Sequence, residues 1–382
     1  MSSERSTRAA AEVNRINLFY PLMPSMGTRW AKMRPWEGKC IAVNAHLTTL
    51  TAALLRELSL GGGKWVVSAA DEATTDHAVV ELLRELGIEV HTGGDVKDQH
   101  LAVLDHEPNL IADVGFDLVA TLLDRAPEKI EHIEAAVEIT RSGITDLRKR
   151  TNLPFGVVNI NDGQLKPHVE NRHGVGEALW GAVRQITGLH LAGRRVLVVG
   201  YGAVGQGLAA YARAAGSVVE VVDITAIRRL TAHYDGFPTP DLEDALSRVE
   251  IAVTATGEPN AIPISALEKV GRELVLVNAG HGGDEIDVAG LRAKASEGVE
   301  VGSNCTRYRL GDSPWLSLLG NGHPLNIVTN SGSPEPVLLH FALLGLTLEW
   351  LAQHPVPTGE CEVPGEIEEL AASLALTALQ GK

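Results

Sequence analysis

Short apolar runs alternate with helix-prone segments through the first half of the chain. The runs have the length of single strands and are bounded by polar or turn-forming residues. The predicted strands cover 39–44, 64–68, 88–91 and 109–113, and the predicted helices between them cover 46–58 and 74–86. Strands that alternate with helices in this way indicate a parallel sheet covered by helices.

The same alternation returns in the second half of the chain, after an interruption at 153–171. The predicted strands there cover 195–199, 218–222, 251–254, 274–278 and 299–301. We therefore predict an α/β fold with two doubly wound, Rossmann-like domains.

The predicted domain boundaries make the first domain discontinuous. The strongly apolar segment 338–351 predicts a helix that returns to the first domain. The first domain then comprises 1–176 and 337–382, and the second comprises 177–336. Residues 1–35 show little periodicity, so no element is predicted there.

Composition and charge narrow the class of protein. The 382 residues carry a net charge of −15, which argues against nucleic acid as the main partner. The three cysteines are odd in number and widely spaced, with no C-x-x-C pair, so neither a disulfide framework nor a metal site is predicted. No signal core or membrane-length apolar stretch occurs, and we expect a cytoplasmic protein that does not bind membranes.

A glycine-rich turn near the middle of the chain carries the clearest chemistry. The strand-like run 196–199 leads directly into Gly200-Tyr201-Gly202-Ala203-Val204-Gly205, and a helix-prone stretch follows. In G-x-G-x-x-G, the first glycine allows a tight turn, the second lets a pyrophosphate approach the backbone, and the third lets the helix pack on the strand. We predict that Gly200, Gly202, Ala203, Val204 and Gly205 bind a dinucleotide.

An acidic residue at the end of the next predicted strand selects the cofactor. Asp223 follows the run 218–222, where a carboxylate binds a ribose 2′-hydroxyl and repels a 2′-phosphate. Arg228 and Arg229 lie a few residues further on, and an arginine there can accommodate a 2′-phosphate. Because Asp223 occupies the deciding position, we predict NAD rather than NADP.

A second cluster, before the turn, can transfer protons. Lys166 and Glu170 are four residues apart, and a lysine beside a carboxylate near a nicotinamide suits removal of a hydroxyl proton during hydride transfer. The alternative is a surface ion pair on a helix. Pro167, inside the pair, argues against a regular exposed helix.

The order of these motifs resembles the S-adenosylhomocysteine hydrolase family. N-x-N-D at 159–162 and Lys-x-x-x-acid-Asn at 166–171 precede the glycine turn at a similar distance. Further similar segments lie at 46–48, 75–77, 113–117, 254–257, 278–281, 285–287 and 307–310. The resemblance runs from about residue 38 to about residue 350.

The resemblance implies a redox-neutral reaction. Bound NAD+ oxidises a ribose 3′-hydroxyl, which makes the 4′ hydrogen acidic. A base removes that hydrogen, the 5′ substituent leaves, water adds, and NADH reduces the ketone.

The resemblance also assigns catalytic residues. Lys166 and Glu170 would handle the 3′-hydroxyl proton, although the family usually has Asp at position 170. Asp113 would be the base at the 4′ carbon. His46 and His281 would act on the leaving group and on water, although each could instead be an ordinary structural histidine.

Other positions are implied to hold NAD or substrate. The remaining predicted cofactor-binding residues are Thr140, Asn171, Thr254, Thr256, Gly257, Asn278, Gly280 and Asn326. The predicted substrate-binding residues are Thr48, Leu50, Ile139 and Ser333.

The chain departs from the family where the family contacts base and sugar. Leu50 and Ile139 stand where the family has glutamates, and Ser333 stands in place of the histidine of its Gly-His-Pro. A second Gly-His-Pro, at 322–324, lies too early to replace it. The family's C-terminal Lys- and Tyr-rich tail has no counterpart after 366–379.

These departures leave several functions open. We favour a nucleoside dehydratase that eliminates water from the 5′ carbon. The alternatives are an authentic S-adenosylhomocysteine hydrolase, a non-catalytic NAD-binding homologue, and a simple NAD dehydrogenase or epimerase. The family is usually oligomeric, so we expect a homo-oligomer, either a dimer or a tetramer.

Overall fold

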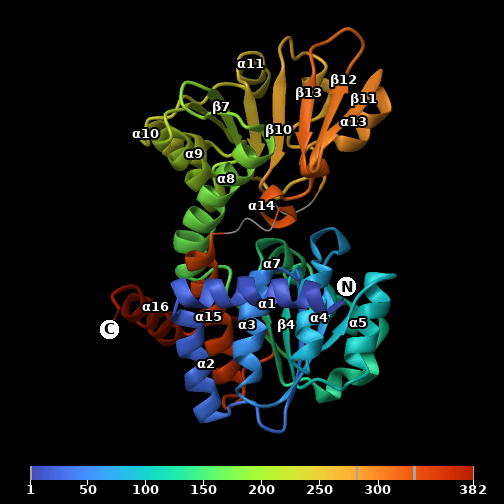
Figure 1. Cartoon of the computed structure of the whole chain (residues 1–382), viewed down its shortest axis with the longest axis vertical. Coiled ribbons are helices and arrows are strands. Elements are labelled where there is room, and N and C mark those ends of the chain that lie inside the picture. Colours follow the sequence, from blue (N-terminus) through green and yellow to red (C-terminus); the bar gives the residue numbers. More distant parts are fainter. Residues whose placement is uncertain (1, 281–282, 330–332, 382) are drawn as a thin grey trace. The chain divides into compact units, whose positions relative to one another are not determined.

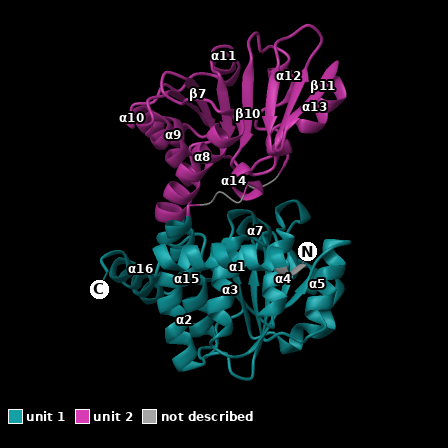
Figure 2. Cartoon of the chain, in the orientation of Figure 1, with its two compact units in different colours: residues 1–166, 334–382 teal, residues 167–333 magenta. Residues whose placement is uncertain are grey.

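The computed structural model describes residues 2–280, 283–329 and 333–381. The chain divides into two compact units, shown in teal and magenta in Figure 2. Unit 1 comprises residues 1–166 and 334–382, and unit 2 comprises 167–333. The first unit is therefore discontinuous, and its boundaries lie several residues before those predicted from the sequence.

Unit 1 is built on a sheet of seven parallel strands (Figure 1). The strands are β1 (Cys40–Ala45), β2 (Lys64–Ala69), β3 (Glu89–His91), β4 (Leu110–Asp113), β5 (Ala135–Glu138), β6 (Gly156–Asn159) and β14 (Gly359–Glu362). Their order is β14-β6-β5-β4-β1-β2-β3. The order reverses between β1 and β4, and a doubly wound sheet binds its ligand at the carboxyl ends of strands at such a point.

Helices connect these strands and cover the sheet. They are α1 (Ser2–Phe19), α2 (Leu22–Met33), α3 (Thr49–Ser59), α4 (His77–Glu85), α5 (Val96–Leu104), α6 (Asp117–Arg125), α7 (Arg141–Leu147), α15 (Pro334–Leu351) and α16 (Gly365–Leu379), with 3₁₀ turns η1 (Glu72–Thr74) and η2 (Pro127–His132). Helix α1 packs on α3 and α4, and α15 packs on α2, α3, β4 and β5. The predicted return of 338–351 to the first domain is thus observed.

The N-terminal helices α1 and α2 were not predicted. Ala9, Val13 and Ile16 form a buried helical stripe on α1, but Ala9 is small and polar residues surround the stripe. Helix α2 contains Gly27, which reads as a helix breaker. A Cβ at Gly27 would lie 2.1 Å from the Glu57 carboxylate, so the glycine allows α2 to pack closely on α3.

Unit 2 contains the second seven-stranded sheet. Its strands are β7 (Arg195–Val199), β8 (Val218–Val222), β9 (Ile251–Thr254), β10 (Leu274–Asn278), β11 (Glu297–Gly302), β12 (Cys305–Arg309) and β13 (Leu316–Leu319). The order is β11-β12-β13-β10-β9-β7-β8, parallel except where β12 pairs with β11 and β13. Both sheets of the predicted α/β fold are therefore present, and the β12–β13 pair is an addition to the prediction.

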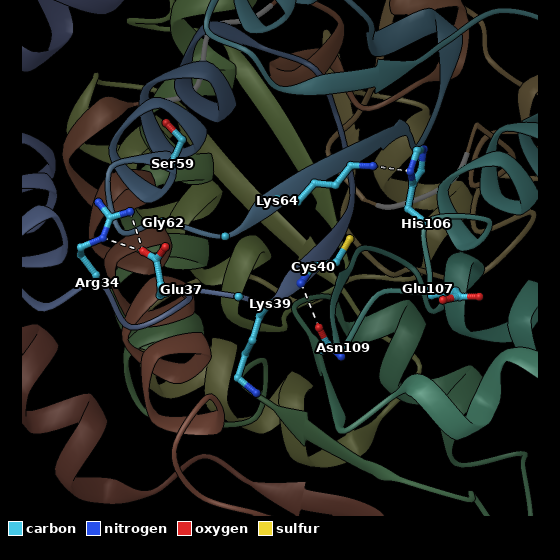
Figure 3. A pocket seen from close by; sticks show the side chains of 12 residues that line it. Arg34, Glu37, Lys39, Cys40, Ser59, Gly62, Lys64, His106, Glu107 and Asn109 are labelled. Atoms are coloured by element: carbon cyan, nitrogen blue, oxygen red, sulfur yellow. Dashed lines mark hydrogen bonds and ion pairs between the residues drawn. The ribbon is translucent and has the colours of Figure 1, made fainter.

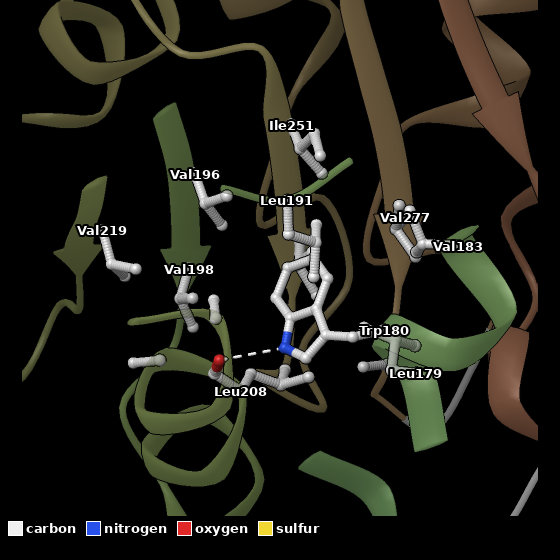
Figure 4. Close-up of a cluster of buried hydrophobic side chains, with 14 of the residues drawn as sticks. Leu179, Trp180, Val183, Leu191, Val196, Val198, Leu208, Val219, Ile251 and Val277 are labelled. Carbon is white, nitrogen blue, oxygen red and sulfur yellow. Dashed lines mark hydrogen bonds between the residues drawn. The ribbon is translucent and has the colours of Figure 1, made fainter. Parts of the chain in front are cut away.

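The helices of unit 2 complete the second doubly wound fold. They are α8 (Gly176–Thr187), α9 (Ala203–Ala214), α10 (Ala226–Tyr234), α11 (Leu242–Leu246), α12 (Ile264–Leu267), α13 (Val288–Lys294) and α14 (Leu325–Val328), with the 3₁₀ turn η4 (Gly320–Gly322). Trp180 of α8 lies against the strand side chains Val198, Ile251 and Val277, and its indole N–H donates to the Leu208 carbonyl at 3.0 Å (Figure 4). This core fixes α8 and α9 on one face of the sheet.

A π-helix, η3 (Lys166–Val175), leads from β6 into α8. Pro167 cannot donate a backbone hydrogen bond, and regular α-helical pairing does not start at this point. Within the described residues, no helix is long and apolar enough to span a bilayer.

Candidate active site

A buried hydrogen-bonded pair marks the switch point of the unit 1 sheet. The Asn44 side chain, near the end of β1, donates to Asp113 Oδ1 at 3.0 Å, at the end of β4. The backbone N–H of Val119, in α6, donates to Asp113 Oδ2 at 2.8 Å. Both carboxylate oxygens of Asp113 thus accept hydrogen bonds inside a fully buried environment.

Glu138, at the end of β5, is buried beside this pair. Its carboxylate accepts from the N–H groups of Gly115, Phe116 and Thr140, and from the Thr140 hydroxyl, at 2.7–3.2 Å. A Cβ at Gly143 would lie 2.3 Å from the Glu138 carboxyl carbon, so the glycine makes room for it. Glu138 therefore fixes the loops that follow β4 and β5.

Burial is the main influence on the pKa of both carboxyl groups. Burial raises the pKa of Asp113. Burial, followed by the repulsion from Asp113, also raises the pKa of Glu138. A raised pKa suits a base, but Asp113 is closed off, so it can remove a substrate proton only if its pocket opens.

His46 lies just after β1 in a defined tautomer. The Thr74 hydroxyl donates to the Asp71 carbonyl at 3.0 Å, so it accepts from His46 Nδ1–H at 2.7 Å. The neutral imidazole then carries its lone pair on Nε2, as general base chemistry requires. The half-buried position is compatible with substrate access.

Two of the predicted substrate-binding positions in unit 1 are apolar. Thr48 caps α3 by accepting from the Thr51 N–H at 3.4 Å. Leu50, in the first turn of α3, is 7% exposed, and Ile139, directly after β5, is 8% exposed. The carboxylates that the resemblance places at 50 and 139 are thus replaced by buried hydrocarbon.

Lys166 and Glu170, the predicted proton-transfer residues, lie on the π-helix. Lys166 begins η3 and is half-buried, Glu170 is 8% exposed, and Asn171 is half-buried. The unit boundary falls directly after Lys166. The alternative of a surface ion pair on a regular helix does not fit this geometry, because η3 is a π-helix and Glu170 is buried.

The N-x-N-D motif forms a rigid turn. The Asn159 side-chain oxygen accepts from the N–H groups of Asn161 and Asp162, each at 3.0 Å. Arg148 donates to the carboxylates of Asp162 and Glu360, each at 2.7 Å. The motif thus ties the loop after β6 to β14 and α7, and it supports the chain that leads to Lys166.

In unit 2, the glycine turn has the geometry that a dinucleotide needs. Gly200 has a φ of +98°, and a Cβ on Gly205 would lie 1.9 Å from the Gly200 carbonyl oxygen. A Cβ at Gly202, by contrast, meets nothing within 4 Å in the described part of the chain. Gly202 also caps the N-terminus of α9, so its backbone faces open space where an anion is stabilised.

Asp223 is fixed beside the turn. Its Oδ2 accepts from the Tyr201 N–H and its Oδ1 from the Thr225 N–H, both at 2.8 Å. Arg228 Nη1 lies 3.7 Å from Asp223 Oδ2. The arginine that could favour a 2′-phosphate is thus paired with the carboxylate that disfavours it.

The ends of β9 and β10 complete this side of the sheet. The buried Thr254 hydroxyl donates to Asn278 Oδ1 at 3.2 Å, and Asn278 Oδ1 also accepts from the Gly280 N–H at 2.7 Å. Glu285 accepts from the backbone N–H groups of Thr256 and Gly257 at 2.9 and 2.8 Å. These bonds hold the predicted cofactor loops at the carboxyl edge, so the residues present fit a bound dinucleotide.

Sequence comparison identifies the family. A family profile described as S-adenosyl-L-homocysteine hydrolase, NAD binding domain, matches residues 171–332. An adenosylhomocysteinase of Thermococcus kodakarensis is 33% identical over 96% of this chain and 90% of its own length. The chain belongs to the adenosylhomocysteinase family. The resemblance drawn from the motifs is confirmed, and so is NAD as the cofactor.

Other adenosylhomocysteinase-type relatives differ in the purine that they are named for. An S-inosyl-L-homocysteine hydrolase of Methanopyrus kandleri is 31% identical over 94% of this chain and 88% of its own length. Among solved structures, a dipicolinate synthase polypeptide from Bacillus halodurans matches with a TM-score of 0.53 at 15% identity, covering 84% of this chain and all of that one. The last likeness concerns the fold alone.

The remaining residues that were predicted to bind NAD or substrate, or to act in catalysis, lie mainly in unit 2. Asn326 is half-buried in α14, and the Ser333 hydroxyl donates to Glu177 Oε2 at 3.2 Å. Ala203 and Val204 form the first turn of α9. His281 lies outside the described residues, so its role as a catalytic histidine stays a prediction.

The sequence did not point to one buried histidine of unit 1. His340, on α15, is 2% exposed, and neither ring nitrogen has a hydrogen-bond partner within the described residues. Burial, and then the charge of Lys166, holds the pKa of His340 well below its usual range. A neutral imidazole near Lys166 offers one donor and one acceptor to a bound hydroxyl or water.

Glu138 and Glu285 were also missed as supporting residues. Both lie in segments that resemble the family, but their roles follow from hydrogen bonds to loops rather than from spacing. For His340, the available signal was a histidine inside the apolar run 337–346 of α15. A polar residue in such a segment is costly to bury and therefore merits attention.

Proposed function

We propose that the protein acts on a nucleoside other than S-adenosylhomocysteine and eliminates a substituent from its 5′-type carbon, with water as the favoured leaving group. Bound NAD+ supplies the hydride acceptor for transient oxidation of the 3′-type hydroxyl. The ketone acidifies the adjacent C–H, and its removal expels the substituent as an alkene forms. Ketone reduction then regenerates NAD+, so the cycle is redox-neutral.

The chain's own residues supply the proton transfers in this proposal. Lys166 and Glu170 take the proton of the oxidised hydroxyl and return it at the end. Asp113 is the proposed base at the 4′-type carbon, provided that its pocket opens, and His46 Nε2 is the alternative base or the acid for the leaving group. His281 shares the work on the leaving group and on water.

The observation that carries the proposal is the apolar character of positions 50 and 139. Leu50 and Ile139 are buried, and neither can accept a hydrogen bond from a base or a sugar hydroxyl. A substrate whose donors met those positions would be left unpaired, which costs about 1–3 kcal/mol for each group. A substrate with a different base or sugar rim avoids that cost.

Authentic S-adenosylhomocysteine hydrolysis is the second candidate. The 33% identity to the Thermococcus kodakarensis enzyme over most of both chains favours it. The Methanopyrus kandleri relative, named for an inosyl substrate, supports a changed base within the same chemistry. A non-catalytic homologue or a simple dehydrogenase is less well supported, because neither needs Lys166, Glu170, Asp113 and His46 together.

A nucleoside panel tests the proposal. The NAD-loaded protein is incubated with 5′-hydroxy nucleosides, hexulose nucleosides and S-adenosylhomocysteine, and the products are analysed by mass spectrometry. Loss of one water from a hydroxylated nucleoside, with little homocysteine release, is the expected result. Fast homocysteine release from S-adenosylhomocysteine would instead establish the hydrolase, and net NADH accumulation would establish a dehydrogenase.

We also propose that the protein is a homo-oligomer. Ile224, Ile227 and Tyr234, on or just before α10, are 97%, 76% and 82% exposed. Large exposed apolar side chains gathered on one helix are typical of protein contacts. Light scattering measures the mass in solution, and a monomer at micromolar concentration would contradict this part of the proposal.

A further inference from the structure

Two imidazoles and a carboxylate converge at the edge of the unit 1 sheet, away from the chemistry described above. Glu89 and His91 lie two residues apart on the edge strand β3, so their side chains share one face. His106 follows α5 and precedes β4. The cluster is separate from Asp113. Strand β2 lies between β3 and β1 in the sheet, and His106 precedes β4, whereas Asp113 is the last residue of β4.

The spacing of the three side chains matches a metal centre. Glu89 Oε1 lies 3.0 Å from His106 Nε2 and 3.4 Å from His91 Nε2. All three potential ligand atoms lie within 4.8 Å of one another. A tetrahedral zinc ion with N and O ligands at about 2.0–2.1 Å has ligand atoms about 3.3 Å apart, so the two short edges already have the required length.

The surroundings leave one ligand atom weakly paired and the site open to water. His91 Nε2 is buried, and its contact with Glu89 Oε1, at 3.4 Å, does not meet the geometry of a hydrogen bond. The Glu89 side chain is 45% exposed, so a water molecule can reach a fourth coordination position. Catalytic-type and surface zinc sites commonly combine three protein ligands with one water.

We propose that Glu89, His91 and His106 bind one divalent cation of the zinc class and thereby join the edge strand β3 to the segment after α5. Two imidazoles with one carboxylate favour Zn²⁺ over Mg²⁺ or Ca²⁺, which prefer all-oxygen sites. A cation held by these residues would add a link between β3 and the segment after α5, which already contact each other through the rings of His91 and His106 and through Glu89. The inference is independent of the proposed function.

The Lys64 ammonium competes with a metal ion for Glu89 and His106. This ammonium donates to His106 Nδ1 at 2.5 Å (Figure 3). The same ammonium lies 3.6 Å from Glu89 Oε2. While Lys64 donates to Nδ1, His106 Nε2 carries a proton and cannot bind a metal. The Lys64 side chain is 52% exposed, so it can move into solvent when a cation binds.

Zinc titration of the full chain tests the proposal. The chelator-treated protein is titrated with Zn²⁺ alone by calorimetry, and Co²⁺ is added separately for absorption spectroscopy. The expected result is one high-affinity zinc site for each chain, with the intense visible absorption of four-coordinate cobalt. Absence of such a site, or a weak six-coordinate cobalt spectrum, would overturn the proposal.

Variants separate this site from other zinc-binding groups. His91→Ala and His106→Ala should each weaken zinc binding at least about tenfold and remove the cobalt absorption, because each deletes a ligand. Lys64→Ala should tighten zinc binding, because it removes a competing cation. Glu89→Gln keeps the size of the side chain and should also weaken binding.

A histidine outside the cluster provides the control. His132 lies 3.8 Å from carboxylate oxygens of Glu107 and Glu131, without a second imidazole in that group. His132→Ala should leave zinc affinity unchanged. Equal losses in His132→Ala and His91→Ala, or no loss in either cluster variant, would contradict the assignment.

Discussion

Buried polar side chains determine the geometry at the carboxyl ends of the strands. Asn44, Asp113 and Glu138 link three strand ends in unit 1. In unit 2, Thr254 and Asn278 link the ends of β9 and β10, and Glu285 holds the loop after β9. Such groups are costly to bury unless every donor and acceptor is paired. Their positions could not be read from the sequence, because the spacing of motifs does not show which loop N–H groups a carboxylate accepts from.

The buried, neutral His340 should make the stability of unit 1 sensitive to acid. Its pKa is depressed in the folded state, so the unfolded chain binds a proton that the native chain excludes, and stability is lost as pH falls below about 6.5. Burial lowers the pKa of His100 to about 4, which acts in the same direction. His340→Met should therefore lose less stability than the wild type between about pH 7 and about pH 5, by up to about 1.4 kcal/mol per pH unit.

Thermal unfolding at the two pH values measures this difference. The matched control is His354→Met, because His354 lies exposed just beyond the other end of α15. That variant should keep the wild-type pH dependence. If His340→Met and the wild type lose the same stability on acidification, the account of His340 as a neutral buried group is wrong.

Asp223 and Arg228 predict how cofactor choice can be changed. In the wild type, Arg228 Nη1 lies 3.7 Å from Asp223 Oδ2. Asp223→Ser removes this carboxylate and leaves Arg228 able to bind a 2′-phosphate. The preference should shift toward NADPH by about tenfold or more. Fluorescence titration with NADH and NADPH measures the ratio, and an unchanged ratio in Asp223→Ser would contradict the assigned role.

At the scale of elements, most strands were predicted, whereas the N-terminal helices α1 and α2 were not. The buried parallel strands β1, β4 and β7 contain the uninterrupted apolar runs 40–43, 110–112 and 196–199, which are easily recognised. Strand β5 was not predicted, because two of its three apolar residues are alanines, which have a low preference for strands. The π-helix η3 could not be foreseen beyond the disruption that Pro167 indicates, because π-helices are rare.

The glycine turn gives a prediction at this scale. Gly202 has φ −76° and ψ −168°, which alanine can adopt, and its Cβ position is open. Gly202→Ala should leave the stability of the NAD-free protein within about 0.5 kcal/mol of the wild type. It should lower NAD affinity by about tenfold or more, because the pyrophosphate needs that space.

Gly205→Ala provides the contrast. Its Cβ would collide with the Gly200 carbonyl, so this variant should lower the melting temperature even without NAD. Thermal unfolding of NAD-free protein and bound NAD after desalting give the two readouts. Full NAD occupancy in Gly202→Ala would show that the cofactor does not approach the turn as inferred.

At the scale of the whole molecule, the chain combines two doubly wound units, and the first is completed by the C-terminal segment 334–382. The sequence predicted this discontinuity from the apolar character of α15. It also predicted the family, because the motifs follow one another in a familiar order. The substrate could not be predicted, because specificity depends on the side chains that line the substrate pocket. Leu50 and Ile139, which are predicted to bind substrate, depart from the family.

The central claim is transient oxidation of a nucleoside other than S-adenosylhomocysteine, and hydrogen exchange tests it most directly. The NAD-loaded protein is incubated in D2O with a 5′-hydroxy nucleoside and, separately, with S-adenosylhomocysteine, and the 4′ proton is followed by NMR. The account predicts exchange and alkene formation with the hydroxylated nucleoside, without net NADH. Rapid exchange and homocysteine release with S-adenosylhomocysteine, and no exchange with any hydroxylated nucleoside, would contradict it.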